Sequence, residues 1–135
     1  MPRLTFSKNE RLNSLKEIDQ LFKEGKSVTN SPIRLIWVEA NTSEIESPPP
    51  VRVMFAVPKK KFSKAVDRNR VRRLLREAYR LEKNRLFEKI GSAVVYNLAI
   101  VFTGTEIPDY NTIQKALIQS LERWLKKITP ATPTT

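Results

Sequence analysis

The cationic side chains of this sequence are concentrated in one stretch, Lys59–Arg80, which reads KKKFSKAVDRNRVRRLLREAYR. The stretch contains ten Lys or Arg residues and only two carboxylates, Asp67 and Glu77, so it carries +8 of the chain's net charge of +11. Like charges this close repel one another, and a fold gains no stability from them. Arg suits phosphate, because its planar guanidinium donates paired hydrogen bonds to phosphate oxygens and stacks on bases. The stretch therefore predicts an RNA or DNA partner.

The sequence holds no residue set that would make the protein a catalyst by itself. It has no Cys and no His, which removes thiol nucleophiles, Cys-based zinc sites and the commonest general base. The closest carboxylates, Glu44 with Glu46 and Glu10 with Glu17 and Asp19, are expected to be solvated. Three Gly residues leave no Gly-rich phosphate loop. The sequence predicts a binding protein without catalytic or metal-ligating residues.

Most of the cationic stretch is predicted to form a helix with two different sides. No Pro or Gly occurs from Ser63 to about Phe87, good helix formers dominate, and Ser63 is the expected N-cap. At 100° per residue, the core-facing stripe comprises Val71, Leu74, Leu75, Ala78 and Leu81. The opposite stripe comprises Asn69, Arg73, Arg76 and Arg80, flanked by Arg68, Arg72 and Tyr79 on one side and Arg70 on the other. The alternative is a solvated basic helix, but solvated faces usually mix the two signs of charge.

Two more helices are predicted on either side of this one. The first runs from about Ser14 to Glu24, where Ser14 and Glu17 make a capping box and Gly25 ends the helix. Its apolar face comprises Leu15, Ile18, Leu21 and Phe22. Asn111 and Gln114 are candidate caps of the last helix, whose apolar stripe comprises Ile113, Ala116, Leu117, Leu121, Trp124, Leu125 and Ile128. Sequence alone favours core packing for Phe22.

Four strands are predicted, at Ser27–Asn30, Ile33–Ala40, Arg52–Val57 and Ala93–Phe102. The last is apolar on both faces apart from Asn97, as expected for a buried central strand. The cationic helix then connects two strands that are expected to be parallel. Residues 1–13 are predicted to be an extended arm with Arg3, Lys8 and Arg11, and residues 41–50 a loop. The predicted fold is a single α+β domain with three helices on a four-stranded sheet, in the order αβββαβα.

The central motif resembles that of the bacterial ribonuclease P protein subunit. The matching run is Lys59-Lys60, followed by Ala65-Val66 and an Arg68-Asn69-Arg70 helix with further Arg residues. Arg11-Leu12, Phe22 and Gly25 resemble the first helix of the family, and the last strand and helix follow in the same order. The sequence departs from the family at Lys61–Lys64, where a usual Gly is missing, and at Ile18, where many members have a second aromatic residue.

The resemblance implies a fold and a function. The fold would be an α/β sandwich like the second domain of some ribosomal proteins, with a left-handed βαβ crossover. The protein would bind a catalytic RNA that removes the 5′ leader from precursor tRNA, and that RNA with its Mg²⁺ ions would perform the hydrolysis. The family's RNA-contacting motif corresponds to Lys59, Lys60, Arg68, Asn69, Arg70, Arg72, Arg73, Arg76 and Arg80. The cleft for the leader would be lined by Ile18, Phe22 and Ile36.

Composition limits the remaining possibilities. No apolar run approaches the roughly 18 residues of a membrane span, no signal peptide is expected, and the absence of Cys fits a cytoplasmic protein. We expect one RNA-binding domain over residues 1–129, a disordered tail at 130–135, no cofactor on the protein alone, and a monomer in a 1:1 complex with RNA. The alternatives are a ribosomal or general structured-RNA-binding protein and a metal-dependent nuclease that needs no RNA.

Overall fold

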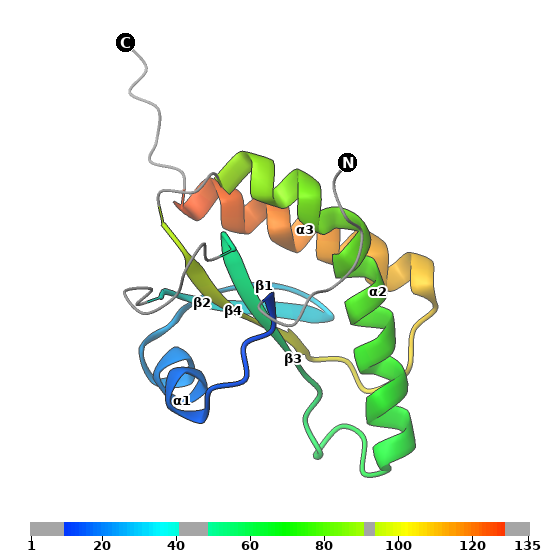
Figure 1. Cartoon of the computed structure of the whole chain (residues 1–135). Helices are drawn as coiled ribbons and strands as arrows, with labels where there is room; N and C mark the ends of the chain where they lie inside the picture. The colour runs from blue at the N-terminus through cyan, green and yellow to red at the C-terminus, as the bar shows by residue number, and fades with distance from the viewer. Residues whose placement is uncertain (1–9, 41–48, 91–93, 129–135) are drawn as a thin grey trace.

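The computed structural model contains three helices and four strands in the predicted order (Figure 1). It describes residues 10–40, 49–90 and 94–128. The elements are α1 (Leu15–Glu24), β1 (Lys26–Asn30), β2 (Ile33–Glu39), β3 (Val51–Ala56), α2 (Ala65–Ile90), β4 (Tyr96–Phe102) and α3 (Tyr110–Ile128). The predicted α+β class and the order αβββαβα are therefore confirmed.

The four strands form one mixed sheet in the order β1-β2-β4-β3. β2 is antiparallel to both β1 and β4, with Leu35 opposite Ile100, whereas β3 runs parallel to β4, with Val53 opposite Leu98. Helix α2 is thus the crossover between two parallel strands, as the sequence predicted. The left-handed sense of that crossover stays a prediction.

Helices cover both faces of the sheet and create two separate cores. In Figure 1, α2 and α3 lie on one side of the sheet and α1 on the other. Alternation along β2 assigns its residues to the two sides. Ile33, Leu35 and Trp37 pack in the larger core with α2 and α3, whereas Ile36 packs in the smaller one with Leu21 of α1. The ring centroids of Trp37 and Trp124 are 6.1 Å apart, and Trp37 is buried in the larger core.

Helix α1 is fixed at both ends by its own sequence. The Ser14 hydroxyl accepts a hydrogen bond from the Glu17 backbone N–H at 3.4 Å, so the predicted N-cap is confirmed. The other half of the predicted capping box is wrong, because the Glu17 carboxylate accepts hydrogen bonds from Arg52 and Asn97 instead. Gly25 ends the helix in an extended conformation. Any Cβ there would lie 2.3 Å from the Leu21 carbonyl oxygen, so glycine is required for close packing and not for an unusual φ.

Helix α3 packs with the predicted stripe but is capped differently. Five residues of the stripe are buried, and Leu125 and Ile128 pack at its margin. The cap is neither Asn111 nor Gln114: the Asp109 carboxylate accepts a hydrogen bond from the Thr112 backbone N–H at 2.8 Å. The prediction was wrong because the helix begins at Tyr110, which makes Asp109 the residue in capping position.

Helix α2 is rotated relative to the sequence prediction. Val71, Leu75 and Ala78 are buried as expected, but Leu81 is 39% exposed. Tyr79, predicted on a flank, is fully buried and packs edge-on against Phe55, with ring centroids 5.9 Å apart. The large ring buries more apolar surface than Leu81 would, which turns the helix toward its Tyr79 side. The helix begins at Ala65, so Lys64 directly precedes its first residue and the predicted N-cap position of Ser63 is wrong.

The chain before α1 pairs with the sheet. Arg11 forms a parallel β-bridge with Val53 of β3, and the Leu12 N–H donates to the Val53 carbonyl oxygen at 2.9 Å. The predicted extended arm is therefore confirmed at its C-terminal end. Arg3 and Lys8 lie outside the described residues, as do most of the 41–50 loop and the 130–135 tail. Within the described ranges, every helix is too short or too polar to cross a bilayer.

Candidate RNA-binding surface

A cationic surface extends from the end of β3 onto α2. It comprises the exposed side chains of Lys59, Lys60, Arg70, Arg73 and Arg76, called here the α2 cationic surface. None of the five forms an ion pair with a carboxylate of the described residues. Solvated cations without an acidic partner keep their full capacity to neutralise phosphate, which distinguishes this surface from an ordinary mixed-charge helix face.

The loop that carries the lysines is held in place by packing. The backbone N–H groups of Lys61 and Phe62 both donate to the Pro58 carbonyl oxygen, at 3.1 and 3.3 Å. Phe62 is buried, and its ring lies 5.9 Å from that of Phe102. The segment that lacks the family's usual Gly is therefore a turn anchored by an aromatic side chain. This anchor fixes the turn that carries Lys59 and Lys60 between the end of β3 and the start of α2.

The other predicted site residues have partners within the protein. Arg68 donates to the carbonyl oxygens of Phe62 and Ser63, both at 2.9 Å, and so ties the loop to the helix. Arg72 donates to the Asn69 side-chain oxygen at 2.9 Å. Arg80 binds Glu77 at 2.5 Å, and this hydrogen bond lowers the pKa of Glu77 below its ordinary value. These residues flank the α2 cationic surface, but some of their hydrogen-bond donors already bind groups within the protein.

The predicted leader-cleft residues lie on the α1 side of the sheet, with different exposure. Phe22 is 47% exposed, so about half of the residue is open to solvent and it is not a core residue, contrary to the interpretation that sequence alone favoured. Ile18 is half-buried at the edge of the smaller core. Ile36 is 6% exposed beneath α1, so it supports the helix and offers little surface of its own. Leu15, predicted on the apolar face of this helix, is instead 84% exposed.

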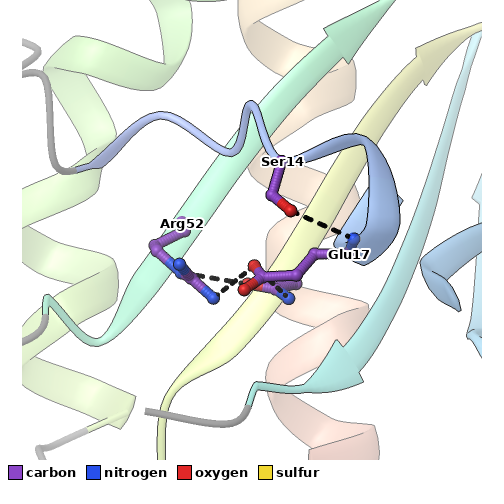
Figure 2. A network of polar contacts seen from close by, with 4 residues as sticks. Ser14, Glu17 and Arg52 are labelled. Atoms are coloured by element: carbon purple, nitrogen blue, oxygen red, sulfur yellow. Dashed lines mark hydrogen bonds and ion pairs between the residues drawn. The ribbon is translucent and has the colours of Figure 1, made fainter. Parts of the chain in front are cut away.

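An ion pair that the sequence analysis missed joins α1 to the sheet (Figure 2). Glu17 Oε2 lies 2.5 Å from the Arg52 guanidinium and 3.3 Å from the Asn97 amide nitrogen. Arg52 also donates to the Asn97 side-chain oxygen at 3.2 Å, which closes a triangle of contacts. The signal was Asn97, a lone amide in a strand that is otherwise apolar. The network fixes α1, and hence Phe22, relative to the sheet.

A second missed ion pair lies on the other side of the sheet. Lys83 Nζ lies 2.7 and 3.0 Å from the two carboxylate oxygens of Glu10, and the Lys83 side chain is 2% exposed. Glu10 and Glu17, expected to be solvated, are therefore both structural. Asp19 matches the expectation, because it forms an exposed ion pair with Lys23. Lys83 lies four residues after Tyr79 on the buried face, but nothing local in the sequence indicates its partner.

The structure supports binding and shows no arrangement for catalysis among the residues it describes. In that part of the chain, no three metal-ligating side chains come together. The shifted pKa values also have structural causes: burial raises the pKa of the Tyr79 hydroxyl, and hydrogen bonds from Thr112 lower the pKa of Asp109. The absence of a cofactor stays a prediction. Fold and surface together define a small basic α+β domain suited to a polyanionic partner.

Comparisons with known proteins identify the family. The sequence model of the family described as Ribonuclease P matches residues 6–128. A ribonuclease P protein component of Porphyromonas gingivalis is 36% identical over 123 residues, which are 90% of this chain and 88% of the relative. The ribonuclease P protein of Staphylococcus aureus superposes with a TM-score of 0.66 at 22% identity, over 85% of this chain and 94% of that one. That of Thermotoga maritima gives 0.64 at 23%, over 84% and 96%.

The chain therefore belongs to the ribonuclease P protein family. The resemblance inferred from the Arg-Asn-Arg helix is confirmed by the relatives in sequence, and the predicted fold is confirmed by the solved structures. Its function is accordingly that of a protein component of ribonuclease P, the endoribonuclease complex that matures the 5′ ends of tRNA.

Proposed function

We propose that the chain is the accessory subunit of ribonuclease P, in which a catalytic RNA and its Mg²⁺ ions perform the hydrolysis. The protein binds that RNA and the 5′ leader of precursor tRNA, as a cytoplasmic monomer in a 1:1 complex. The observation that carries this proposal is the α2 cationic surface, five exposed cations without an acidic partner among the described residues. A sequence without His or Cys supports a binding role over a catalytic one.

The α2 cationic surface is proposed to bind the phosphate backbone of the catalytic RNA. Arg73 and Arg76 are one turn apart on the open side of the helix, and Arg70 is one turn before Arg73, so the three can follow a backbone. Lys59 and Lys60 extend this line beyond the start of the helix. If five to eight phosphates are neutralised, log K falls with log salt at a slope of about −4 to −7.

The leader is proposed to lie across the sheet beside α1. One cross-strand row, formed by Thr29, Arg34, Val101 and Ala56, faces the α1 side and remains at least partly exposed. The next row, with Ile36 and Ala99, is buried under α1. Arg34 could neutralise a leader phosphate. Phe22 could stack on a leader base, a contact worth roughly 1–3 kcal/mol.

Two variants test these two surfaces separately. Arg73→Ala should weaken binding to the catalytic RNA, because it removes one exposed cation, and should leave the melting temperature nearly unchanged. Phe22→Leu should weaken binding to precursor tRNA by roughly five- to 100-fold and leave mature tRNA, which has no leader, unaffected. Lys115→Ala, an exposed cation at the start of α3, is the matched control.

The outcomes separate the alternatives. Equal loss of precursor and mature tRNA in Phe22→Leu would show that the leader lies elsewhere. A salt slope near zero would show that the α2 cationic surface is merely solvated. Binding that is equally strong for any structured RNA would favour a general RNA-binding protein.

A further inference from the structure

A second group of cations lies at the opposite edge of the fold. It comprises Lys26 of β1 and Arg123, Lys126 and Lys127 of α3, called here the β1-edge cationic group. All four side chains are exposed, and none forms an ion pair with a carboxylate in the described ranges. The predicted RNA-binding residues include none of them.

Helix α3 positions this group along the outer strand of the sheet. The Asn30 amide donates to the Gln119 side-chain oxygen at 3.0 Å, and Arg123 donates to the Thr29 carbonyl oxygen at 2.9 Å. Gln119, Arg123 and Lys127 are spaced by four residues, so they form one row facing β1. Because α3 packs against α2 on one side and β1 on another, this row faces away from the α2 cationic surface.

The row borders a hollow of suitable chemistry. The hollow has a volume of about 460 Å³ and is lined by Ser27, Val28, Thr29, Arg123, Lys126 and Lys127. Lys127 also lines a neighbouring hollow of about 440 Å³ together with Lys26, but that hollow is mixed, because the carboxylates of Glu24 and Glu39 and apolar side chains line it as well. The C-terminal dipole of α3 stabilises Lys126 and Lys127, but it does not account for Lys26, which belongs to the sheet.

We propose that the β1-edge cationic group binds the phosphate backbone of a second RNA segment. The proposal rests on the proposed function, which supplies RNA as the partner of this chain. Cations and hydroxyl groups line the hollow of about 460 Å³, with Val28 as its one apolar side chain. A protein partner would instead be anchored by aromatic or aliphatic side chains in an apolar pocket.

The position of the group gives it a separate role. In Figure 1, α2 begins at the lower right of the molecule and α3 ends at the upper left. The two surfaces therefore contact different parts of an RNA, or two RNAs, and together orient the protein. Both the catalytic RNA and precursor tRNA present the same phosphate chemistry, so each is a separate arm of the test.

The test compares two charge reversals on the same helix. Lys127→Glu removes a cation of the group, and Lys115→Glu makes the same change of net charge at an exposed position 12 residues earlier in the same helix. Filter binding is measured across a range of salt concentrations with catalytic RNA alone and with precursor tRNA alone. Lys127→Glu should weaken the binding of one of the two RNAs about tenfold and should reduce the slope of its log K against log salt by about 1. Lys115→Glu should change the affinity for either RNA less than twofold.

Each outcome has a distinct meaning. Loss with catalytic RNA, or loss with precursor tRNA, identifies which molecule supplies the segment. Equal effects of Lys127→Glu and Lys115→Glu would overturn the inference, since the group would then act through net charge alone. If Arg73→Ala also binds both RNAs normally, the proposed function fails as well. Arg123→Gln repeats the binding test by removing a charge of the group without reversing it. The melting temperature of this variant is measured as well, and an unchanged value shows that any loss of RNA binding is not caused by unfolding.

Discussion

The network of Glu17, Arg52 and Asn97 gives a prediction about what holds α1 on the sheet. Arg52→Met keeps the aliphatic part of the side chain and removes the guanidinium. This leaves the side-chain oxygen of Asn97, a residue 1% exposed, without its Arg52 donor. It also leaves the Glu17 carboxylate without its cation, although Glu17 is 28% exposed and keeps a route to water.

The expected loss follows from these two contacts. An unsatisfied buried acceptor costs about 1–3 kcal/mol, and a charge-assisted hydrogen bond contributes about 1.5–3 kcal/mol. Breaking a fully buried ion pair costs about 3–5 kcal/mol, and the exposure of Glu17 lowers that figure. We therefore expect Arg52→Met to lower the free energy of unfolding by about 2–4 kcal/mol. For a chain of this size, that corresponds to a melting temperature lower by roughly 6–20 °C.

Urea denaturation followed by circular dichroism measures the loss. Arg34→Met is the matched control: Arg34 is an exposed arginine in strand β2 of the same sheet, and its substitution should change stability by no more than about 0.5 kcal/mol. A double-mutant cycle with Glu17→Gln should give a coupling energy of about 1–3 kcal/mol. If Arg52→Met is as mild as Arg34→Met, the network does not hold α1 and the reasoning is wrong.

Three further predictions concern the helices. Leu75→Ala should lower the free energy of unfolding by about 2–5 kcal/mol because Leu75 is fully buried, whereas Leu81→Ala should lower it by less than about 1 kcal/mol; equal losses in urea denaturation would contradict the observed rotation of α2. Lys83→Met should cost about 3 kcal/mol by leaving Glu10 unpaired, and adding Glu10→Gln should recover most of it. The pKa of Asp109 in the folded protein is lowered below its ordinary value of 3.8, so the ionised carboxylate stabilises the folded protein above about pH 4, and this contribution is lost as the pH falls through the folded pKa. Asp109→Ala should therefore lower the melting temperature at pH 7 and lower it much less at about pH 2.

The order of the elements could be predicted from sequence because each depends on local signals. The apolar stripe of α3 repeats over its whole length, and Gly25 marks the end of α1. Strand β4 is apolar on both faces, which indicated a central strand covered on both sides. The helix before it was therefore expected to connect two parallel strands. Ser14 was recognised because a hydroxyl before a helix is a local capping signal.

The buried face of α2 could not be predicted, because partners from distant parts of the chain determine it. Tyr79 is buried through Phe55 of β3, and Lys83 is buried through Glu10 of the N-terminal arm. An Arg-rich helix with few apolar residues offers a weak periodicity, and that periodicity alone places Leu81 on the core stripe and Tyr79 on a flank.

The candidate site was predicted by composition more reliably than by individual residue. The concentration of Lys and Arg identified the α2 cationic surface, but not which residues have partners within the protein. The contact between Arg72 and Asn69 could have been anticipated from their spacing of three residues. The contacts of Arg68 with two loop carbonyls could not, since they depend on the turn that Phe62 anchors.

Reconstitution with the catalytic RNA tests the central claim most directly. Cleavage of precursor tRNA is measured at low Mg²⁺ with RNA alone, with protein alone, and with both together, using wild type and a double variant carrying Arg73→Ala and Arg76→Ala. The account predicts strong stimulation of the RNA by wild-type protein, much weaker stimulation by the double variant, and no cleavage by protein alone. Cleavage by RNA-free protein, lost when an Asp or Glu is substituted, would contradict it.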